Sequence, residues 1–307
     1  MILGMDIGGT KTAALAIDGT GLIGQQVRLA TGFGPAAVVS TAVDAVTQVA
    51  NAAGVSIDAF DSIGIGIPGQ VELGNGRVEH AVNLGIDELD LGGELASRLG
   101  VAVRVENDVK AAALGAFHLL SLTGSMAYLN VGTGLAAGLV LDGRLWRGSR
   151  GTAGEVGHIT VDPGGAPCPC GQRGCLETVA SGAAVAREWG TAHPLPVLSL
   201  FDAADAGDPA ASAIRSRLAD GIAVAIRTLV LTVDVDTVVI GGGISSLGTR
   251  LSEQVHASLR RSAESSRFIR SLDLEARVQL LPLGSPAAPV GAALVGSDSA
   301  QATELVL

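Results

Sequence analysis

The stretch ILGMDIGGTKTAALAIDG, residues 2–19, decides the fold. It contains an apolar run that ends at Ile7, a turn sequence Gly8-Gly9-Thr10, and a second apolar run that ends at Ile17. Short apolar runs separated by a glycine-rich segment are typical of two β-strands joined by a tight turn. The start of the chain therefore predicts a β-hairpin with a glycine turn, followed by an Asp-Gly turn at Asp18-Gly19.

The same pattern returns in residues 126–143, which read MAYLNVGTGLAAGLVLDG. An apolar run again leads into a glycine turn, Gly132-Thr133-Gly134, and a second apolar run again ends at an Asp-Gly pair. Chance similarity between two glycine-rich hairpins is the alternative interpretation. Two such hairpins roughly 120 residues apart favour two related domains.

Strand and helix patterns alternate around these hairpins. Helical periodicity is found at residues 35–53, 92–99 and 109–120, and strand patterns at 62–67 and 101–105. After residue 180 helices dominate, at 183–189, 209–233 and 251–262, apart from a strand at 237–240 that leads into a triple glycine directly ahead of a helix. This alternation predicts layered α/β domains. We expect a smaller first domain at 1–120, joined by a final helix within about 289–307, and a larger second domain at 121–288.

Composition and charge exclude several classes of protein. The chain has 307 residues, of which 48% are hydrophobic and 16% charged, which is typical of a folded protein with room for two domains. The formal net charge of -10 argues against a nucleic-acid partner and disfavours polyphosphate as a substrate. Residues 1–6 lack the features of a signal peptide, and charges interrupt the apolar segment 221–243, so we expect a cytoplasmic protein without a membrane partner.

The glycine turns are candidate phosphate-binding elements. Backbone N–H groups of glycines between two strands can approach phosphate oxygens closely, and an aspartate at the strand end can hold Mg²⁺ through water. The alternative is a tight hairpin with a solvated aspartate. Three glycine turns in one chain strengthen the hypothesis of ATP binding, for which the candidates are Asp6, Gly8, Gly9, Thr10, Lys11, Gly132, Thr133, Gly134, Gly241, Gly242 and Gly243.

The tripeptide Glu106-Asn107-Asp108 lies between a predicted strand and a predicted helix. Either Asn107 or Asp108 can be a helix N-cap, because both side chains accept hydrogen bonds from the first backbone N–H groups. A carboxylate at a strand end can also accept the proton of a sugar hydroxyl during phosphoryl transfer. The two interpretations are compatible, since Asn107 can cap the helix while Asp108 reacts.

The segment 151–177 contains all three cysteines of the chain. Three thiolates and one imidazole suit a tetrahedral, structural Zn²⁺ site, so we expect zinc at His158, Cys168, Cys170 and Cys175. Free buried thiols are the alternative. The same segment carries Glu155 and Glu177, which with His158 suit sugar hydroxyls, although solvated surface carboxylates are equally ordinary.

In this combination the chain resembles the ROK family (repressors, open reading frames, kinases), close to its bacterial glucokinase-like sugar kinases. The resemblance spans nearly the whole chain. Its most specific part is Glu155-x-Gly157-His158 followed by Cys168-x-Cys170-Gly171-x-x-Gly174-Cys175. The other matching motifs are Asp6-Ile7-Gly8-Gly9-Thr10-Lys11, Gly64-Ile65-Gly66-Ile67-Pro68-Gly69, Asn83-Leu84, Glu106-Asn107-Asp108, Gly132-Thr133-Gly134 and Gly241-Gly242-Gly243.

The resemblance implies two actin-like, ribonuclease H-like domains that flank a cleft for ATP and sugar. It implies Asp108 as the general base for the sugar 6-hydroxyl and His158 as both zinc ligand and sugar ligand. Such kinases are usually homodimers or homotetramers. The sugar-binding residues it implies are Gly69, Asn83, Asn107, Asp108, Glu155, His158 and Glu177.

The expected activity is therefore ATP-dependent phosphorylation of a hexose, with glucose first. N-acetylglucosamine, mannose, N-acetylmannosamine and fructose are the alternative substrates. A sugar-sensing repressor would need a DNA-reading helix-turn-helix, normally ahead of the strand that here begins at Ile2. A catalytically silent sugar-binding protein is the other alternative, but it would be expected to lose Asp108 or the phosphate glycines, which this chain keeps.

Overall fold

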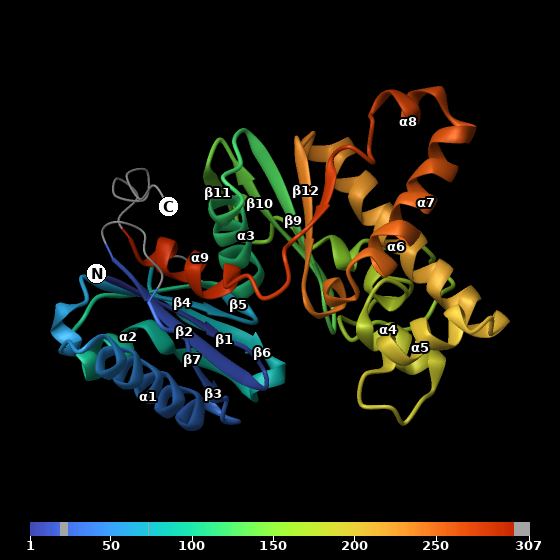
Figure 1. Cartoon of the computed structure of the whole chain (residues 1–307). Helices are drawn as coiled ribbons and strands as arrows, with labels where there is room; N and C mark the ends of the chain where they lie inside the picture. Colours follow the sequence, from blue (N-terminus) through green and yellow to red (C-terminus); the bar gives the residue numbers. More distant parts are fainter. Residues whose placement is uncertain (19–23, 73, 298–307) are drawn as a thin grey trace. The chain divides into compact units, whose positions relative to one another are not determined.

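The computed structural model describes residues 1–18, 24–72 and 74–297 (Figure 1). Contacts between Cα atoms divide the chain into two compact units. Unit 1 consists of Met1–Thr123, Gly138–Ala153 and the chain from Pro286 onward, and unit 2 consists of Gly124–Ala137 and Gly154–Ser285. The domain limits expected from the sequence stay a prediction. The Asp18-Gly19 turn lies partly outside the described residues.

Unit 1 is built on a sheet with the strand order β3-β2-β1-β4-β8. The strands are β1 (Ile2–Ile7), β2 (Lys11–Ile17), β3 (Val27–Ala30), β4 (Ser62–Ile67) and β8 (Val103–Asn107). β1, β2 and β3 pair antiparallel, as the first hairpin predicted, whereas β1, β4 and β8 run parallel. The carboxyl ends of these three parallel strands therefore lie at one edge of the sheet.

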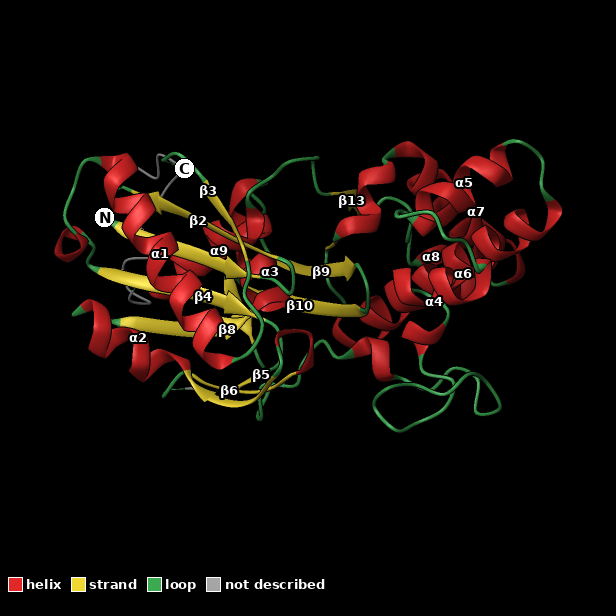
Figure 2. Ribbon diagram, turned by 90° about the horizontal axis from the view of Figure 1, so that it is seen from below, coloured by secondary structure: helices red, strands yellow, loops and turns green. Residues whose placement is uncertain are grey.

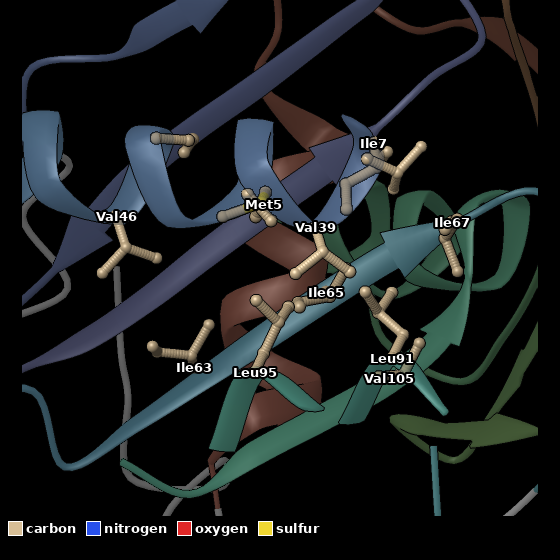
Figure 3. Close-up of a cluster of buried hydrophobic side chains, with 14 of the residues drawn as sticks. Met5, Ile7, Val39, Val46, Ile63, Ile65, Ile67, Leu91, Leu95 and Val105 are labelled. Carbon is tan, nitrogen blue, oxygen red and sulfur yellow. The ribbon is translucent and has the colours of Figure 1, made fainter. Parts of the chain in front are cut away.

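One face of this sheet carries the apolar core of unit 1. Side chains alternate between the two faces of a strand, so Leu3, Met5 and Ile7 of β1 share a face with Ile63, Ile65 and Ile67 of β4. Helices α1 (Pro35–Ala53) and α2 (Leu91–Leu99) pack their buried residues against this face (Figure 3). Figure 2 shows α1 and α2 crossing the strands on that side.

The opposite face of the sheet carries glycines in β1 and β4, so the backbone there is open to close approach. A Cβ atom on Gly4 would lie 1.9 Å from the carbonyl oxygen of Pro289, and one on Gly64 would lie 1.7 Å from that of Ala292. Helix α9 (Ala287–Gly296) consequently packs its backbone directly on β1 and β4. Helix α3 (Asp108–Leu119) packs in turn on α9, where Gly115 and Gly291 allow the same close approach.

A second sheet has the strand order β11-β10-β9-β12-β13. Its strands are β9 (Ser125–Val131), β10 (Leu135–Leu141), β11 (Arg144–Trp146), β12 (Thr237–Gly241) and β13 (Val278–Leu280). As in the first sheet, a glycine-turn hairpin is followed by parallel strands, since β12 pairs parallel with both β9 and β13. This repeated order supports the internal duplication that the two hairpin sequences indicated.

The remaining elements of unit 2 are mostly helical, as the sequence predicted after residue 180. They are η3 (Val156–His158), η4 (Leu176–Thr178), α4 (Gly182–Trp189), α5 (Pro196–Asp205), α6 (Pro209–Val233), η5 (Gly243–Leu247), α7 (Thr249–Ser265) and α8 (Arg267–Ser271). The sequence did not predict α5 or α8. It placed a helix directly after the triple glycine, whereas the 3-10 helix η5 comes first and Gly248, at φ 59°, separates it from α7.

Two further differences concern unit 1. The strand predicted at 101–105 lies at Val103–Asn107, so Asn107 ends the strand and Asp108 begins the helix. A small antiparallel sheet was not predicted; it consists of β5 (Gln70–Val71), β6 (Arg77–Ala81) and β7 (Ile86–Asp90), with η1 (Ile57–Ala59) and η2 (Val82–Leu84) nearby in the chain. Among the described residues, no helix combines the length and apolarity needed to cross a membrane.

Candidate active site

Acidic residues gather where the parallel strands of unit 1 end. The strand registers place Asp6 of β1 opposite Gly66 of β4, and Gly66 opposite Glu106 of β8. Gly66 is needed between them, because a Cβ atom there would lie 3.2 Å from the Ala111 side chain and 3.4 Å from the Cα atom of Asp108. The absence of a side chain at Gly66 thus lets the start of α3 lie against the sheet beside Asp6.

Burial and the Asp108 carboxylate together raise the pKa of Asp6. Desolvation is the larger cause, the negative charge of Asp108 adds to it, and the positive charge of Lys11 opposes it; the resulting pKa is about 7. A carboxyl group that is half protonated near neutral pH is poised to gain a cation, because a bound cation would restore the charged form. Asp6 and Asp108 therefore form an acidic pair in which a nearby cation would stabilise the charged form of Asp6.

Asn107 and Asp108 share the start of α3. The Asn107 side-chain oxygen accepts hydrogen bonds from the N–H groups of Val109, at 3.1 Å, and Lys110, at 3.2 Å, so Asn107 is the N-cap. Its Nδ2 donates to the carbonyl oxygen of Gly69 at 3.1 Å. Asp108 is the first helical residue, and its Oδ1 also accepts from Val109 N–H at 2.9 Å. Of the two capping alternatives, the structure assigns the cap to Asn107.

The first glycine turn lies at the same edge of unit 1. Gly8 N–H donates to the Lys11 carbonyl oxygen at 3.0 Å, which closes the turn between β1 and β2, and Thr10 and Lys11 are exposed. A Cβ atom on Gly9 would lie 3.3 Å from the Cβ atom of Asn83, an exposed residue of η2. Unit 1 therefore brings together its predicted phosphate turn, its predicted base and the predicted sugar ligands Gly69, Asn83 and Asn107.

Unit 2 brings its two glycine turns together in the same way. Gly242, at φ 85°, approaches the end of β9, where an added Cβ atom would lie 2.6 Å from the Val131 carbonyl oxygen and 2.7 Å from Asn130 Oδ1. The turn Gly132-Thr133-Gly134 follows β9 directly, and its carbonyl oxygens at Gly132 and Thr133 accept N–H groups from Gly182 and Ala183 at the start of α4. The turn is thereby held on one side by a helix N-terminus.

The predicted zinc ligands form one cluster in unit 2. The ligand atoms of His158, Cys168, Cys170 and Cys175 all lie within 4.8 Å of one another. Cys170 Sγ is 3.7 Å from Cys175 Sγ, and Cys168 Sγ is 3.8 Å from His158 Nδ1. Ligands on a tetrahedral Zn²⁺ with bonds of about 2.3 Å stand about 3.8 Å apart, so the spacing and the chemistry of this donor set both fit the ion.

The thiols of this cluster differ in their pKa. The backbone N–H of Gln172 lowers the pKa of Cys170 to about 6, whereas burial raises the pKa of Cys168 to about 12 and also raises that of Cys175. A cation that draws all three sulfurs into the thiolate form would offset the desolvation of the buried pair.

Of the three predicted sugar ligands of unit 2, two lie close together, and for the third, Glu155, only its exposed position is described. His158 Nδ1 is 3.8 Å from Glu177 Oε1, which also accepts from Cys168 Sγ at 3.3 Å, so these residues contact the cysteine cluster. Glu177 Oε2 lies 3.5 Å from the backbone N of Leu135, directly after the second glycine turn. Glu155 is exposed immediately before η3. Glu177 thus connects the Cys/His cluster with the second glycine turn, which the sequence did not indicate.

Sequence reasoning also gave no role to several residues that support the site, although two of them, Glu106 and Gly66, lie within the matching motifs. Glu106 is 3% exposed and is paired with Arg147, which follows β11. Asn130 and Gly66 lie opposite site residues on neighbouring strands, Asn130 opposite Gly241 and Gly66 opposite Glu106. These positions are known only once the pairing of the strands is known. For Glu106 a signal existed, since a carboxylate inside a buried strand requires a partner. Nothing in the sequence pointed to Arg147.

Comparison with known proteins agrees with this architecture. The profile of the ROK family matches residues 2–295, so the chain belongs to the ROK family. A glucokinase from Halalkalibacterium halodurans is 34% identical, with 87% of this chain and 88% of the relative covered. An N-acetylmannosamine kinase from Yersinia pseudotuberculosis is 31% identical, with coverage of 79% and 82%.

A solved structure gives the same result for the fold. The ROK family glucokinase from Streptomyces griseus, determined in complex with glucose and AMPPNP, superposes with a TM-score of 0.81 at 30% identity, covering 96% of this chain and 98% of that one. The predicted actin-like α/β fold class and the predicted family are thereby confirmed.

Proposed function

We propose that this protein transfers the γ-phosphoryl group of ATP to the 6-hydroxyl group of a hexose, with glucose as the first candidate substrate. Its class is that of an ATP-dependent sugar kinase, in agreement with its kinase relatives. AMPPNP in the Streptomyces griseus glucokinase is an analogue of ATP, which supports ATP as the phosphoryl donor here. An N-acetylated hexosamine is the second candidate substrate, because a relative named N-acetylmannosamine kinase is 31% identical.

The observation that carries the proposal is the placement of Asp108. It begins α3 at the carboxyl edge of the sheet, against Gly66 and within Coulombic reach of Asp6, while Asn107 caps the helix. In this role a carboxylate oxygen of Asp108 accepts the proton of the sugar 6-hydroxyl. The hydroxyl oxygen forms the new bond to the γ-phosphorus, the bond from that phosphorus to the bridging oxygen breaks, and ADP leaves.

The binding roles divide between the two units. For the sugar we assign Gly69, Asn83, Asn107 and Asp108 from unit 1 and Glu155, His158 and Glu177 from unit 2. Magnesium near Asp6 would neutralise charge on the phosphates. For ATP and its magnesium we assign Asp6, Gly8, Gly9, Thr10, Lys11, Gly132, Thr133, Gly134, Gly241, Gly242 and Gly243.

A structural zinc ion would be held by His158, Cys168, Cys170 and Cys175, whose mutual spacing fits a tetrahedral site. His158 presents Nδ1 to the cluster, so its Nε2 is the atom we assign to the sugar. We further propose that the enzyme is a homodimer or homotetramer in the cytoplasm and that its domains follow the limits expected from the sequence.

The test is ADP release measured with a panel of sugars, for the wild-type protein and for Asp108→Asn. The wild type is expected to turn over glucose or one of the other hexoses. Asp108→Asn is expected to lower kcat about 10³-fold, because an amide cannot accept the proton, while the Kd for the sugar stays within a few-fold. Full activity in Asp108→Asn would remove the base assignment, and no turnover of any sugar by the wild type would remove the proposed activity.

A further inference from the structure

The ion pair between Glu106 and Arg147 includes a buried carboxylate that the proposed mechanism leaves unused. Glu106 is 3% exposed, and its Oε2 accepts a hydrogen bond from Arg147 Nε at 2.5 Å. Both residues belong to unit 1. A buried carboxylate is costly unless it is paired and hydrogen-bonded, so a purely structural position would rarely use one.

The second oxygen of Glu106 acts on the catalytic junction. Its Oε1 accepts the backbone N–H of Asn107 at 2.9 Å, at the point where β8 ends and α3 begins. Asn107 in turn caps α3 and donates to the Gly69 carbonyl oxygen. One carboxylate therefore fixes the backbone of the residue before Asp108, and that residue fixes the first turn of the helix that Asp108 begins.

Arg147 is itself held in place. Its carbonyl oxygen accepts the N–H of Ala153 at 3.1 Å, which closes the loop 147–153, and β11, which ends at Trp146, contacts α3. The backbone that carries Arg147 is thus held by a closed loop on one side and by the contact of β11 with α3 on the other. The loop leads in the chain to Gly154 and Glu155.

We propose that Glu106 and Arg147 are positioning residues that hold the β8–α3 junction, and with it the carboxylate of Asp108, in the geometry needed for proton transfer. The inference rests on the proposed role of Asp108 as general base. The pair touches neither sugar nor ATP in this proposal and acts through the Asn107 backbone. Misplacement of a reacting group by about 1 Å can cost about 10²-fold in rate, so loss of the pair should be visible in kcat.

The experiment compares Arg147→Met, Arg147→Lys, Glu106→Gln and the double variant Glu106→Gln/Arg147→Met with the wild type. We measure kcat, KM for the sugar and Tm, and run all kinetics well below the lowest Tm. Arg147→Met leaves the Glu106 charge buried without its partner and is expected to lower kcat about 30-fold to 100-fold. The double variant removes that unpaired charge and is expected to recover at least about 10-fold of the loss, because coupled residues are not additive.

Rescue and control variants separate positioning from stability. Arg147→Lys keeps a charge without the Nε geometry and is expected to fall between the wild type and Arg147→Met. Arg215→Met is the matched control, because it removes an arginine whose side chain is 16% exposed and paired with Asp205 in unit 2. It is expected to lower Tm and leave kcat unchanged.

Three outcomes would overturn the inference: a wild-type kcat in folded Arg147→Met, a double variant no faster than Arg147→Met, or an equal loss of kcat in Arg215→Met. If Arg147→Met does not fold, the kcat values of Glu106→Gln and Arg147→Lys test the inference instead. A wild-type kcat in both variants would refute the positioning role of the pair. Because each variant is compared with the wild type on its best sugar, a silent wild type would count against the proposed function alone.

Discussion

The two sheets of this protein have the same strand order but place different chemistry at equivalent positions. Counting from each glycine turn, Asp6 of β1 corresponds to Asn130 of β9, and Gly66 of β4 corresponds to Gly241 of β12. The first sheet ends in carboxylates, with Asp6, Glu106 and Asp108 at its edge, whereas the second ends in an amide and glycines. A duplicated scaffold thus carries the acids in one copy only.

The two copies also differ in what covers them. Gly4 and Gly64 of the first sheet meet the backbone of α9, whereas the corresponding residues of the second sheet are Tyr128 and Val239, which have side chains. In unit 2 the loop next to the glycine turn is instead held by a cluster of metal-ligand side chains. The first sheet therefore meets its covering helix backbone to backbone at these positions, whereas the second sheet carries side chains there. As we propose, zinc is an additional support in unit 2 alone.

The largest effect is expected when the residue at the end of β1 is exchanged for its equivalent in the second sheet. Asp6→Asn replaces the carboxylate by the amide that the second sheet uses and is expected to lower kcat/KM for MgATP about 10³-fold, because the Mg²⁺ site loses its charge. The reciprocal variant Asn130→Asp is expected to raise KM for MgATP, because a negative charge beside the second glycine turn repels phosphate. Asp6→Asn with wild-type kinetics would contradict the assignment of Asp6.

The pKa of Asp6 gives the same prediction a pH dependence. At a pH above the pKa of about 7 the Asp6 carboxylate is ready for Mg²⁺, and below that pH each binding event must release a proton. The affinity for MgADP is therefore expected to fall up to about 10-fold per pH unit below 7.

In the protein without ligand, the pH dependence of folding stability has the opposite sign. The raised pKa stabilises the folded state below the unfolded value of 3.8, and this contribution is lost as pH rises to about 7, by about 1.4 kcal/mol per unit. Calorimetry measures the affinity for MgADP, and denaturant titration measures the free energy of unfolding, each as a function of pH for the wild type and for Asp6→Asn. The part of each pH dependence that comes from Asp6 must be absent in Asp6→Asn.

The glycine face of the first sheet provides the next test. Gly64→Ala would place a Cβ atom 1.7 Å from the Ala292 carbonyl oxygen, so α9 must move, and the free energy of unfolding is expected to fall by about 3 kcal/mol or more. Gly164→Ala is the matched control, because the nearest atom to its added Cβ would be Asp162 Oδ1 at 3.6 Å. Denaturant unfolding measures both variants. A loss below about 1 kcal/mol for Gly64→Ala would show that the backbone contact with α9 is not tight.

The proposed zinc site at His158, Cys168, Cys170 and Cys175 gives the smallest expected effect, and it tests unit 2. Cys175→Ser is expected to contain no zinc by elemental analysis and to raise KM for the sugar about 10-fold to 100-fold, because His158 and Glu177 contact the cluster. Arg173→Ala, in the same loop but outside the ligand set, should keep both zinc and KM. Zinc-free wild-type protein with unchanged KM would refute the structural role of the metal.

Much of the fold could be predicted because the decisive signals are local. The apolar runs around Gly8-Gly9-Thr10 and Gly132-Thr133-Gly134 predicted both hairpins, and the helices at 35–53 and 209–233 have the predicted limits. The limits of β8 were two residues off, because the apolar residues at 101–105 do not reveal that pairing with β4 continues to Asn107. The small sheet β5-β6-β7 was missed because its short strands lack a periodic pattern.

The parts of the candidate site that could be predicted are those whose residues lie close together in one sequence motif. The proposed zinc ligands are an example, since their ligand atoms lie close together in the structure, as their clustering in the sequence indicated. Arg147 is the opposite case, because its partner Glu106 is 41 residues away and only the packing of β11 on α3 brings the two together. Supporting residues of this kind depend on tertiary contacts that no local spacing encodes.

The position of α9 has a consequence for the synthesis of this protein. The helix at residues 287–296 covers the glycine face of strands β1 and β4, which are synthesised long before it, and the helix that starts with Asp108 rests on it. A nascent chain therefore holds its first sheet half covered until residue 296 has left the ribosome, with the glycine face open to other partners in the meantime. The support of α3, and with it the position of Asp108, is complete only once α9 has packed, so chains that stop before α9 should be inactive and prone to aggregation.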